Sequence, residues 1–591
     1  MAMGVTRRPK LLYAAVVICI FLFLTWHYDA IPDIESADRP NGAPVPPLDD
    51  KGKKLDDAHS PSGSDGNAPN PAEPALAQDA HKLPTADDFK PHFQAVMLLP
   101  GITMADAKST CLWGPAEKVN FQYGTDKDWV TDDRPDQELE QKRREWHTFV
   151  ESGMIPYSQV EGRFNGRGLV IVAGNADTLM RVKVILRALV RLNSVIPVEI
   201  HYWDDEMDMG KGQELLDIYP EIYFNDLSKD HNILHIKKDG FFGINYQLKT
   251  ASLINSRFAE PILLDSDNIP VIDPATLYDS DEYKEYGTIF WPDIARTRPN
   301  NPAWAITNTP CRMDEYEQES GQLLVDKRRF FYHLQLASWL NNEQGAYYNE
   351  FLLGAKDMFR FAWHALKTRY GKPKRWLTSL GTVNGGFYCG HSFAQHHPDS
   401  GGKIAFVHGG LTKTTDLEVM RWQRDKQGGY YRNYKLAPSD EDPMQSVNVA
   451  IKFDAVEYMP NKPGGTHVAM CTDLFDVEPK NIDEILPGFE RIFDELGGYW
   501  KLDEADKAKA VDAKLQETKE KEATDKDGLA TDVVGTGTAN AQNIDNAVEV
   551  PTSGSDQGAK QDVQDSAATV ADGSSQGSQE EVRFDPPSPA S

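Results

Sequence analysis

Two acidic residues with a single serine between them carry the strongest chemical signal in the sequence. Asp265 and Asp267 directly follow Ile262-Leu263-Leu264, an apolar run typical of a buried strand. Two carboxylates at this spacing can hold a hard divalent cation, which bridges them to a diphosphate. The same residues are also compatible with an ordinary strand-end turn in which Asp267 acts as a cap. The pattern alone leaves both interpretations open.

Two further side chains are candidates for the same site. His408 ends a second apolar run, residues 404–407, and its imidazole suits manganese-like ions as a third ligand. A histidine at a strand end is more often simply hydrogen-bonded, so this role is a hypothesis. Lys249 lies one predicted helix upstream of Asp265 and could contact phosphate. The alternative is a solvated surface lysine.

The elements around these residues alternate between apolar runs and amphipathic segments. Strands are predicted at residues 169–173, 198–202, 221–224 and 262–264, with helices around 179–189, 213–219 and 248–258. This alternation is typical of an open α/β sheet with parallel strands. In such sheets, ligands bind at the carboxyl ends of the strands.

Three more residues lie at those predicted strand ends and are candidates for binding a nucleotide. Gly174 and Asn175 leave the first strand, where glycine lets a nucleotide approach the backbone closely, and Trp203 follows the second strand. The sequence contains neither GxGxxG nor a P-loop motif. A dinucleotide-binding domain and a P-loop enzyme are therefore unsupported.

The N-terminal sequence predicts a membrane anchor. Arg7, Arg8 and Lys10 precede an apolar run that ends at Trp26. A cleaved signal peptide is the alternative, but no small-residue cleavage pattern follows the run. Because the positive charges come first, we expect the N-terminus in the cytosol and the remaining chain in the lumen.

Composition divides the chain of 591 residues into five segments. We expect a cytosolic tail at 1–10, a transmembrane signal anchor at 11–28, a disordered stem at 29–92, a catalytic domain at 93–502 and an acidic, low-complexity tail at 503–591. The first part of that tail could form a solvated helix. The net charge of −28 argues against general nucleic-acid binding, which needs basic surface.

The five cysteines do not form a metal-binding pattern. Cys19 lies in the apolar N-terminal run, and the other four, Cys111, Cys311, Cys389 and Cys471, are far apart. A lumenal body permits one or two disulfides of undetermined pairing, and buried free thiols are an equal alternative.

Several segments, in this order along the chain, resemble the fungal MNN-type α-mannosyltransferases. The resemblance extends over roughly residues 166–413. The matching segments are 167–171, 186–187, 196–200, 249–254, 263–271, 290–293, 319–322 with Lys327, and 356–362. Stem and tail do not contribute to it.

The resemblance implies a type II Golgi membrane protein with a GT-A-like (Rossmann-like) fold, an open mixed sheet flanked by helices. It implies GDP-mannose as donor, Mn²⁺ as cofactor, an α-mannoside acceptor on a glycoprotein or wall glycan, and retention of configuration. Asp265 and Asp267 match the family's acidic motif, and His408 matches its late strand-end histidine. Asp293 and Gln322 are then candidates for holding the mannose or stabilising the oxocarbenium face.

Two other functions remain open at this stage. An enzyme of the same fold could use a UDP-sugar, because the acidic pair does not select the nucleotide. A non-catalytic scaffold in a complex with other glycosyltransferases is the alternative from another class. The intact acidic pair argues against the scaffold, since a silent protein has no need of a metal site.

Overall fold

Six strands form a mixed sheet that carries the predicted site. A computed structural model describes residues 76–111, 134–236, 246–312, 314–352, 354–399, 401–409, 415–438, 449–452 and 471–531. The chain divides into two units, Met1–Pro71 and Ala72–Ser591, and all described residues belong to the second. The predicted anchor at 11–28 lies outside the described residues. Among those described, no helix has both the length and the apolar character needed to cross a bilayer.

The strand order of this first sheet is β3-β2-β1-β4-β7-β6. Strands β1 (Arg167–Val172), β2 (Val198–Tyr202), β3 (Ile222–Asp226) and β4 (Glu260–Leu264) are parallel. Strands β7 (Gln318–Val325) and β6 (Thr288–Pro292) extend the sheet in antiparallel fashion beyond β4. The predicted open mixed α/β sheet is confirmed, and the parallel half places four strand ends along one edge.

Helices connect the parallel strands because each apolar strand is followed by an amphipathic segment. They are α5 (Ala176–Arg191), α6 (Met209–Leu216) and α7 (Tyr246–Asn255). Asn175 caps α5 by accepting a hydrogen bond from the Thr178 backbone at 2.9 Å. The buried side chains of α5, which include Leu179, Val182 and Leu186, pack against the inward residues of β1 and β2.

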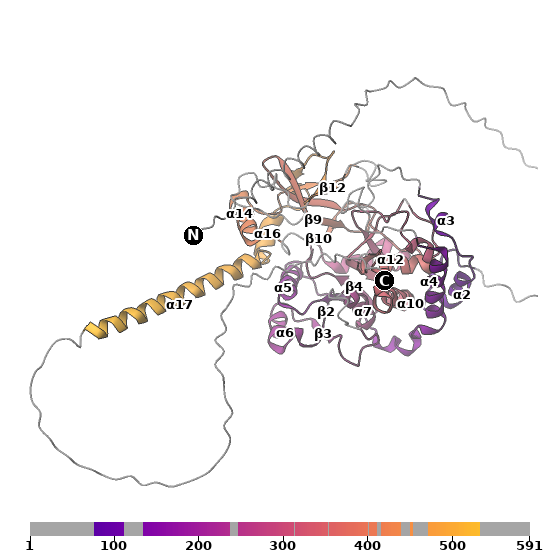
Figure 1. Cartoon of the computed structure of the whole chain (residues 1–591), viewed down its shortest axis with the longest axis horizontal. Helices are drawn as coiled ribbons and strands as arrows, with labels where there is room; N and C mark the ends of the chain where they lie inside the picture. The colour runs from indigo at the N-terminus through magenta and orange to yellow at the C-terminus, as the bar shows by residue number, and fades with distance from the viewer. Residues whose placement is uncertain are drawn as a thin grey trace, which may run out of the picture. The chain divides into compact units, whose positions relative to one another are not determined.

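A helical layer covers the other face of the sheet. Helices α10 (Lys327–Ser338) and α12 (Lys356–Ala365) pack together, and α10 also packs on α7 (Figure 1). Two earlier helices, α2 (Phe89–Met97) and α4 (Asp136–Thr148), join the same core through residues such as Phe89 and Trp146. The shorter helices are α3 (Met104–Lys108), α8 (Asp281–Tyr286), α9 (Ala303–Ile306) and α11 (Gly345–Tyr348).

A second sheet, which the sequence analysis did not predict, follows in the chain. Its strand order is β12-β13-β9-β8-β11-β14, and β10 pairs with both β9 and β5. The strands are β5 (Asn268–Pro270), β8 (Thr378–Asn384), β9 (Phe387–His396), β10 (Ile404–Gly409), β11 (Asn433–Lys435), β12 (Val449–Lys452), β13 (Cys471–Leu474) and β14 (Lys480–Asn481). Helices α14 (Leu417–Gln427) and α16 (Phe489–Glu495) lie beside it (Figure 1).

Both ends of the body differ from the segment boundaries expected from composition. Ordered packing begins before residue 93, since Ala86 and Phe89 are fully buried. At the other end, α17 runs from Trp500 to Thr531 and crosses the expected boundary at 502. Leu502 is buried, whereas the described side chains from Asp506 to Lys521 are exposed. A few apolar residues, such as Phe89 and Leu502, pack against the body although the segments around them are polar on average. The average composition of a segment therefore does not show where its packing begins or ends.

The four cysteines of the body form two disulfides. Cys111 bonds to Cys311, and Cys389 bonds to Cys471. The first joins the N-terminal helices to the segment before β7, and the second joins β9 to β13. Of the two alternatives left open for the cysteines, the structure contains the disulfides.

Candidate metal and sugar-nucleotide site

The turn that carries the acidic pair is held in place by the neighbouring strand. The Asp265 amide donates to the Gly321 carbonyl of β7 at 2.8 Å, and the Asn268 amide donates to the Asp265 carbonyl at 3.0 Å. The Asn268 side chain adds a 2.8 Å bond to the same Gly321 carbonyl. These bonds fix the turn that carries the acidic side chains at the end of β4.

The two carboxylates and His408 converge at this edge. Strand β10 runs antiparallel to β5, with His408 opposite Asn268, and this pairing brings the histidine beside the acidic turn. One ligand atom from each of Asp265, Asp267 and His408 lies within 4.8 Å of the others. His408 Nε2 lies 3.6 Å from Asp267 Oδ1. Two carboxylates and one imidazole are a donor set that fits Mn²⁺.

Lys249 lies within this group of residues. Its ammonium donates to Asp265 Oδ2 at 2.7 Å, and both side chains are about four-fifths buried, with exposures of 20% and 19%. Burial disfavours the charge, but the carboxylates of Asp265, Glu319 and Asp267 together outweigh it and raise the pKa of Lys249. Lys249 is therefore a charged partner of the acidic turn, and the solvated-lysine alternative does not describe it.

A second lysine holds a neighbouring pair of carboxylates. Lys356 Nζ, at the start of α12, lies 2.6 Å from Asp293 Oδ2 and 2.7 Å from Glu317 Oε2. Burial opposes the charge of Lys356, but these carboxylates raise its pKa well above the usual value. Asp293, predicted as a site residue, thus lies directly after β6 in a buried ion-paired cluster. Lys356 and Glu317 were not predicted.

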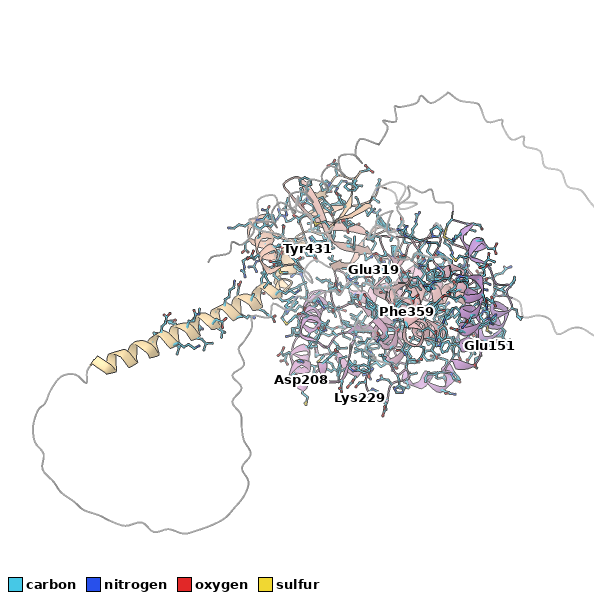
Figure 2. The ribbon with its side chains drawn as sticks, in the orientation of Figure 1. Glu151, Asp208, Lys229, Glu319, Phe359 and Tyr431 are labelled. Carbon is cyan, nitrogen blue, oxygen red and sulfur yellow. A yellow bond between two sulfur atoms is a disulfide. The ribbon has the colours of Figure 1, made fainter. Side chains whose placement is uncertain are left out.

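Glu319 connects the two lysine clusters and was also missed. Its carboxylate accepts a 2.7 Å hydrogen bond from the Gly321 amide and lies 3.7 Å from His408 Nδ1. Burial and the charge of Asp293 raise the pKa of Glu319, against the opposing effects of His408, Lys249 and Lys356. Figure 2 shows Glu319 within the body. The sequence signal that could have identified Glu319 is an acidic residue just before the apolar run Leu323-Leu324-Val325.

Gln322 lies in β7 beside the acidic turn, and the role predicted for it in holding the mannose stays a prediction. Its side chain is fully buried, and Oε1 accepts a hydrogen bond from the Asn268 side chain. This bond joins Gln322 to the residue that follows the acidic pair.

The predicted nucleotide-binding residues lie at the ends of β1 and β2. A side chain at Gly174 would come within 2.6 Å of Glu206, so only glycine fits at this close approach. Asn175 is used as the cap of α5. Trp203 is partly buried against a cluster that includes Leu248 and Ala251 of α7, the helix that carries Lys249. All three share the carboxyl edge of the parallel strands with Asp265.

Part of the sequence is similar to known mannosyltransferases. The mannosyltransferase family Mannosyl_trans3 matches residues 166–317 and 312–397. The α-1,2-mannosyltransferase MNN21 of Candida albicans is 27% identical over 301 residues, which cover 41% of this chain and 44% of that protein. The α-1,2-mannosyltransferase MNN2 of Saccharomyces cerevisiae is 28% identical over 149 residues, 24% of each chain. The chain spans less than half the length of these relatives.

Among solved structures, the galactosyltransferase LgtC in complex with donor and acceptor sugar analogues is 14% identical, with a TM-score of 0.26 over 35% of this chain and 74% of that one. Mouse xyloside xylosyltransferase 1 is similar at a TM-score of 0.24 and 14% identity, over 34% of this chain and 81% of that one.

The sheet and the acidic strand end lie in the region that is similar in sequence to mannosyltransferases. Residues 166–397 match the model of the Mannosyl_trans3 family, and the chain is distantly homologous to fungal α-1,2-mannosyltransferases.

Proposed function

We propose that the chain is a metal-dependent, retaining α-mannosyltransferase that transfers mannose from GDP-mannose to an α-mannoside. The observation that carries this proposal is the convergence of Asp265, Asp267 and His408 within 4.8 Å at the carboxyl edge of the parallel strands. Homology to α-1,2-mannosyltransferases supports the choice of sugar. The strand order and the position of the acidic pair are consistent with a GT-A-like fold.

Asp265, Asp267 and His408 would hold a divalent cation such as Mn²⁺. When bound, the cation neutralises the diphosphate of the leaving nucleotide. Lys249 adds a positive charge directly beside Asp265. The departing phosphate thus meets charge from a protein side chain that is already ordered and buried, which lowers the cost of reorganisation during the reaction.

The reaction exchanges one C–O bond for another at C1 of the mannose. The bond from C1 to the phosphate oxygen breaks, and a bond from C1 to the acceptor oxygen forms on the same face. The acceptor hydroxyl proton passes to the departing phosphate oxygen, so atoms and charge balance without a separate protein base. Retention follows because the donor and the product are both α-linked.

The remaining residues bind the two ends of the donor. Asp293, with Lys356 beside it, is proposed to hold the mannose hydroxyls, since charged groups form strong hydrogen bonds with them. Gly174, Asn175 and Trp203 line the ends of β1 and β2 and are proposed to bind the nucleoside. Gln322 Oε1 accepts a hydrogen bond from the Asn268 side chain and so supports the acidic turn.

The proposed location is the Golgi membrane, with a single N-terminal anchor and a lumenal catalytic region. The two disulfides are compatible with an oxidising compartment. The acceptor is proposed to be an α-mannoside on a glycoprotein or wall glycan. A complex with other glycosyltransferases remains part of this proposal.

A donor panel tests the proposed function. The full chain is incubated with Mn²⁺, short α-mannosides and GDP-mannose or one of several UDP-sugars, and the acceptor mass is measured. Addition of one hexose from GDP-mannose alone is the expected result. Addition from a UDP-sugar would change the donor and keep the enzyme class. No addition from any donor by folded protein would contradict transferase activity and favour a scaffold.

A further inference from the structure

Lys356 lies between two carboxylates from neighbouring strands, and the three residues form a lysine clamp. The Lys356 ammonium donates to Asp293 Oδ2 at 2.6 Å and to Glu317 Oε2 at 2.7 Å. Asp293 directly follows β6, Glu317 directly precedes β7, and the Asp293 amide donates to the Glu317 carbonyl at 2.8 Å. The lysine therefore joins through side chains the same two strand ends that this backbone bond joins.

The Asp293 carboxylate is fixed at both of its oxygens. Oδ1 accepts a 2.7 Å hydrogen bond from the Ile294 amide, and Oδ2 accepts the bond from Lys356. The Trp376 indole donates to the Asp293 carbonyl at 3.0 Å and holds the backbone as well. An ionised carboxylate has about four acceptor positions, so these two bonds do not use up its capacity for further donors.

The lysine clamp is largely buried but not sealed. Lys356, Asp293 and Glu317 keep 18%, 15% and 12% of their side chains exposed. The ion pair between Arg360 and Asp357 differs, since these side chains keep only 1% and 3%. Hydrogen bonds are electrostatically stronger where water is largely excluded. The clamp therefore combines such a setting with residual access for a small polar ligand.

The lysine clamp adjoins the candidate metal site at Glu319. Burial raises the pKa of Glu319, and the charge of Asp293 adds to this effect. His408 and Lys356 lower the same pKa, so candidate metal ligand and clamp both lie near this carboxylate. In a sugar nucleotide, C1 of the sugar is bonded directly to the diphosphate. The sugar of a bound donor must therefore lie beside the metal site, as the clamp does.

We propose that Lys356 is a positioning residue that fixes the Asp293 carboxylate to accept hydrogen bonds from hydroxyls of the donor sugar, with Glu317 as its second anchor. A carboxylate that is already fixed loses little freedom when the sugar binds. Its charge-assisted hydrogen bonds are stronger than those of a neutral acceptor. Lys356 acts through Asp293 and does not touch the sugar. This inference rests on the proposed function, which places a sugar nucleotide at this edge.

The affinities for GDP-mannose and for GDP test the inference together. Calorimetry measures both, with Mn²⁺ and without acceptor, for the full-chain parent, Lys356→Met, Asp293→Asn and the double variant. Because GDP lacks the sugar, only contacts to the sugar change the ratio of the two affinities. Each single variant is expected to bind GDP-mannose about 10–100-fold more weakly, as on loss of a hydrogen bond to a charged group, and GDP less than about 3-fold more weakly.

The double variant measures whether Lys356 acts through Asp293. Its affinity for GDP-mannose is expected to lie within about 3-fold of the weaker single variant, because two residues that act as one unit do not add their effects. Glu317→Gln should cause a smaller loss than Lys356→Met, since Lys356 keeps its bond to Asp293. A GDP-mannose affinity of Glu317→Gln as weak as that of Lys356→Met would contradict this order of the two anchors.

Lys435→Met provides the matched control. Lys435 Nζ lies 2.7 Å from Asp473 Oδ1 in the second sheet, and the two side chains keep 7% and 15% of their surface exposed. Removal of this buried lysine–aspartate pair is expected to change neither affinity by more than about 3-fold. Thermal unfolding verifies that each variant is folded. If Lys356→Met is not, Lys356→Arg replaces it, because a planar guanidinium keeps the charge but not the geometry of a single ammonium nitrogen.

The possible outcomes separate the inference from the proposed function. Unchanged affinities in Lys356→Met, or an equal loss for GDP and GDP-mannose, would overturn the positioning role and show that the clamp serves only the fold. Additive losses in the double variant would also overturn it. Absence of GDP and GDP-mannose binding by the folded parent would overturn both the positioning role and the proposed donor.

Discussion

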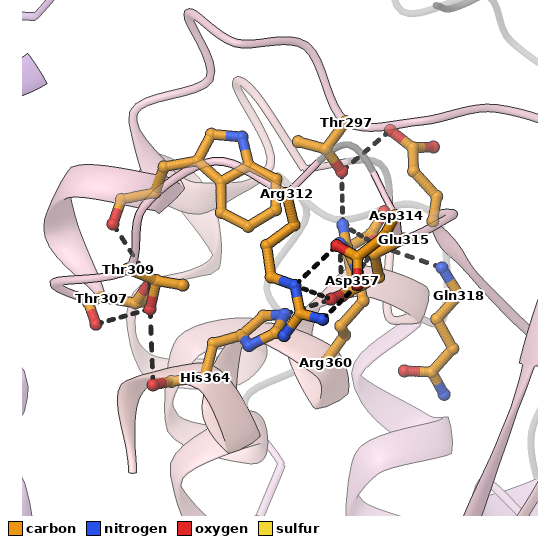
Figure 3. Close-up of polar contacts among 12 residues, drawn as sticks. Thr297, Thr307, Thr309, Arg312, Asp314, Glu315, Gln318, Asp357, Arg360 and His364 are labelled. Atoms are coloured by element: carbon orange, nitrogen blue, oxygen red, sulfur yellow. Dashed lines mark hydrogen bonds and ion pairs between the residues drawn. The ribbon is translucent and has the colours of Figure 1, made fainter. Parts of the chain in front are cut away.

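The body contains two buried clusters of charged side chains, and the clusters differ in the balance of acidic and basic groups. In the first, Asp265, Asp267 and Glu319 gather around His408, with Lys249 as a cation. In the second, Arg360 of α12 donates to Asp357 and Glu315 at 2.9 Å each. Figure 3 shows this second network, with His364 and Thr297 at its edge.

The pKa shifts of Glu315 and Glu319 have opposite directions and reflect this difference in charge balance. Burial would raise the pKa of Glu315, but His364 and Arg360 outweigh it and hold that pKa well below its usual value. For Glu319, burial together with Asp293 prevails and the pKa rises. Asp357, a partner of Arg360, also contacts Lys356, and burial and Glu317 raise its pKa although Arg360 opposes this. A neutralised network fixes structure, whereas an excess of carboxylate favours a cation.

Removal of the central cation from the balanced network has the largest expected effect. Arg360→Leu leaves Glu315 and Asp357 buried without their main partner and is expected to cost about 3–5 kcal/mol of unfolding free energy. Chemical denaturation measures it. Arg369→Leu is the control, because Arg369 and its partner Asp79 are 59% and 55% exposed and such pairs contribute about 0–1 kcal/mol. A loss below about 1 kcal/mol in Arg360→Leu would contradict the structural role of this network.

Removal of the cation from the acidic cluster is expected to act in another way. Lys249→Met frees Asp265, so the Mn²⁺ affinity should stay level or rise. Mannose transfer should fall about 100-fold, as on loss of one group that stabilises a developing anion. Calorimetric titration and initial rates measure the two effects. Lys183→Met, which breaks a surface pair with Glu214, is the control and should change neither. Weaker Mn²⁺ binding in Lys249→Met would contradict the claim that the cluster around His408 has an excess of carboxylates.

Acid should destabilise the body through neutral histidines that belong to neither cluster. Burial lowers the pKa of His147, His391 and His396 to about 4. The unfolded chain binds these protons near pH 6.5, so stability is lost as the pH falls from about 6.5 toward about 4. Each histidine contributes a slope of up to about 1.4 kcal/mol per pH unit.

Chemical denaturation at pH 7 and pH 5 measures this slope. His391→Gln should remove the contribution of one proton to it. An identical slope in the parent and the variant would show that folding does not lower the pKa of His391.

Local sequence patterns were sufficient to predict the parallel half of the first sheet and its acidic turn. Residues 167–172 and 260–264 form β1 and β4, and Asp265 and Asp267 follow β4 as expected. Each of these features depends on residues that are near neighbours in the chain. A buried strand reads as an apolar run, and its end is marked by the first charged residues.

The features that were not predicted depend on pairing between distant segments. Glu319 meets His408 only because β10 returns to pair with β5, and Lys356 meets Asp293 only because α12 packs beside β7. The two disulfide pairings and the second sheet have the same origin.

Mannose transfer with and without the acidic pair tests the central claim most directly. The full chain and its Asp265→Asn/Asp267→Asn variant are incubated with GDP-mannose, Mn²⁺ and a short α-mannoside, and the acceptor mass is followed. We expect the parent to add one mannose only when Mn²⁺ is present, and the folded variant to be slower by about 1,000-fold or more, as on loss of several kcal/mol of charge stabilisation. Equal transfer by both proteins would contradict the assignment of this cluster as the metal site.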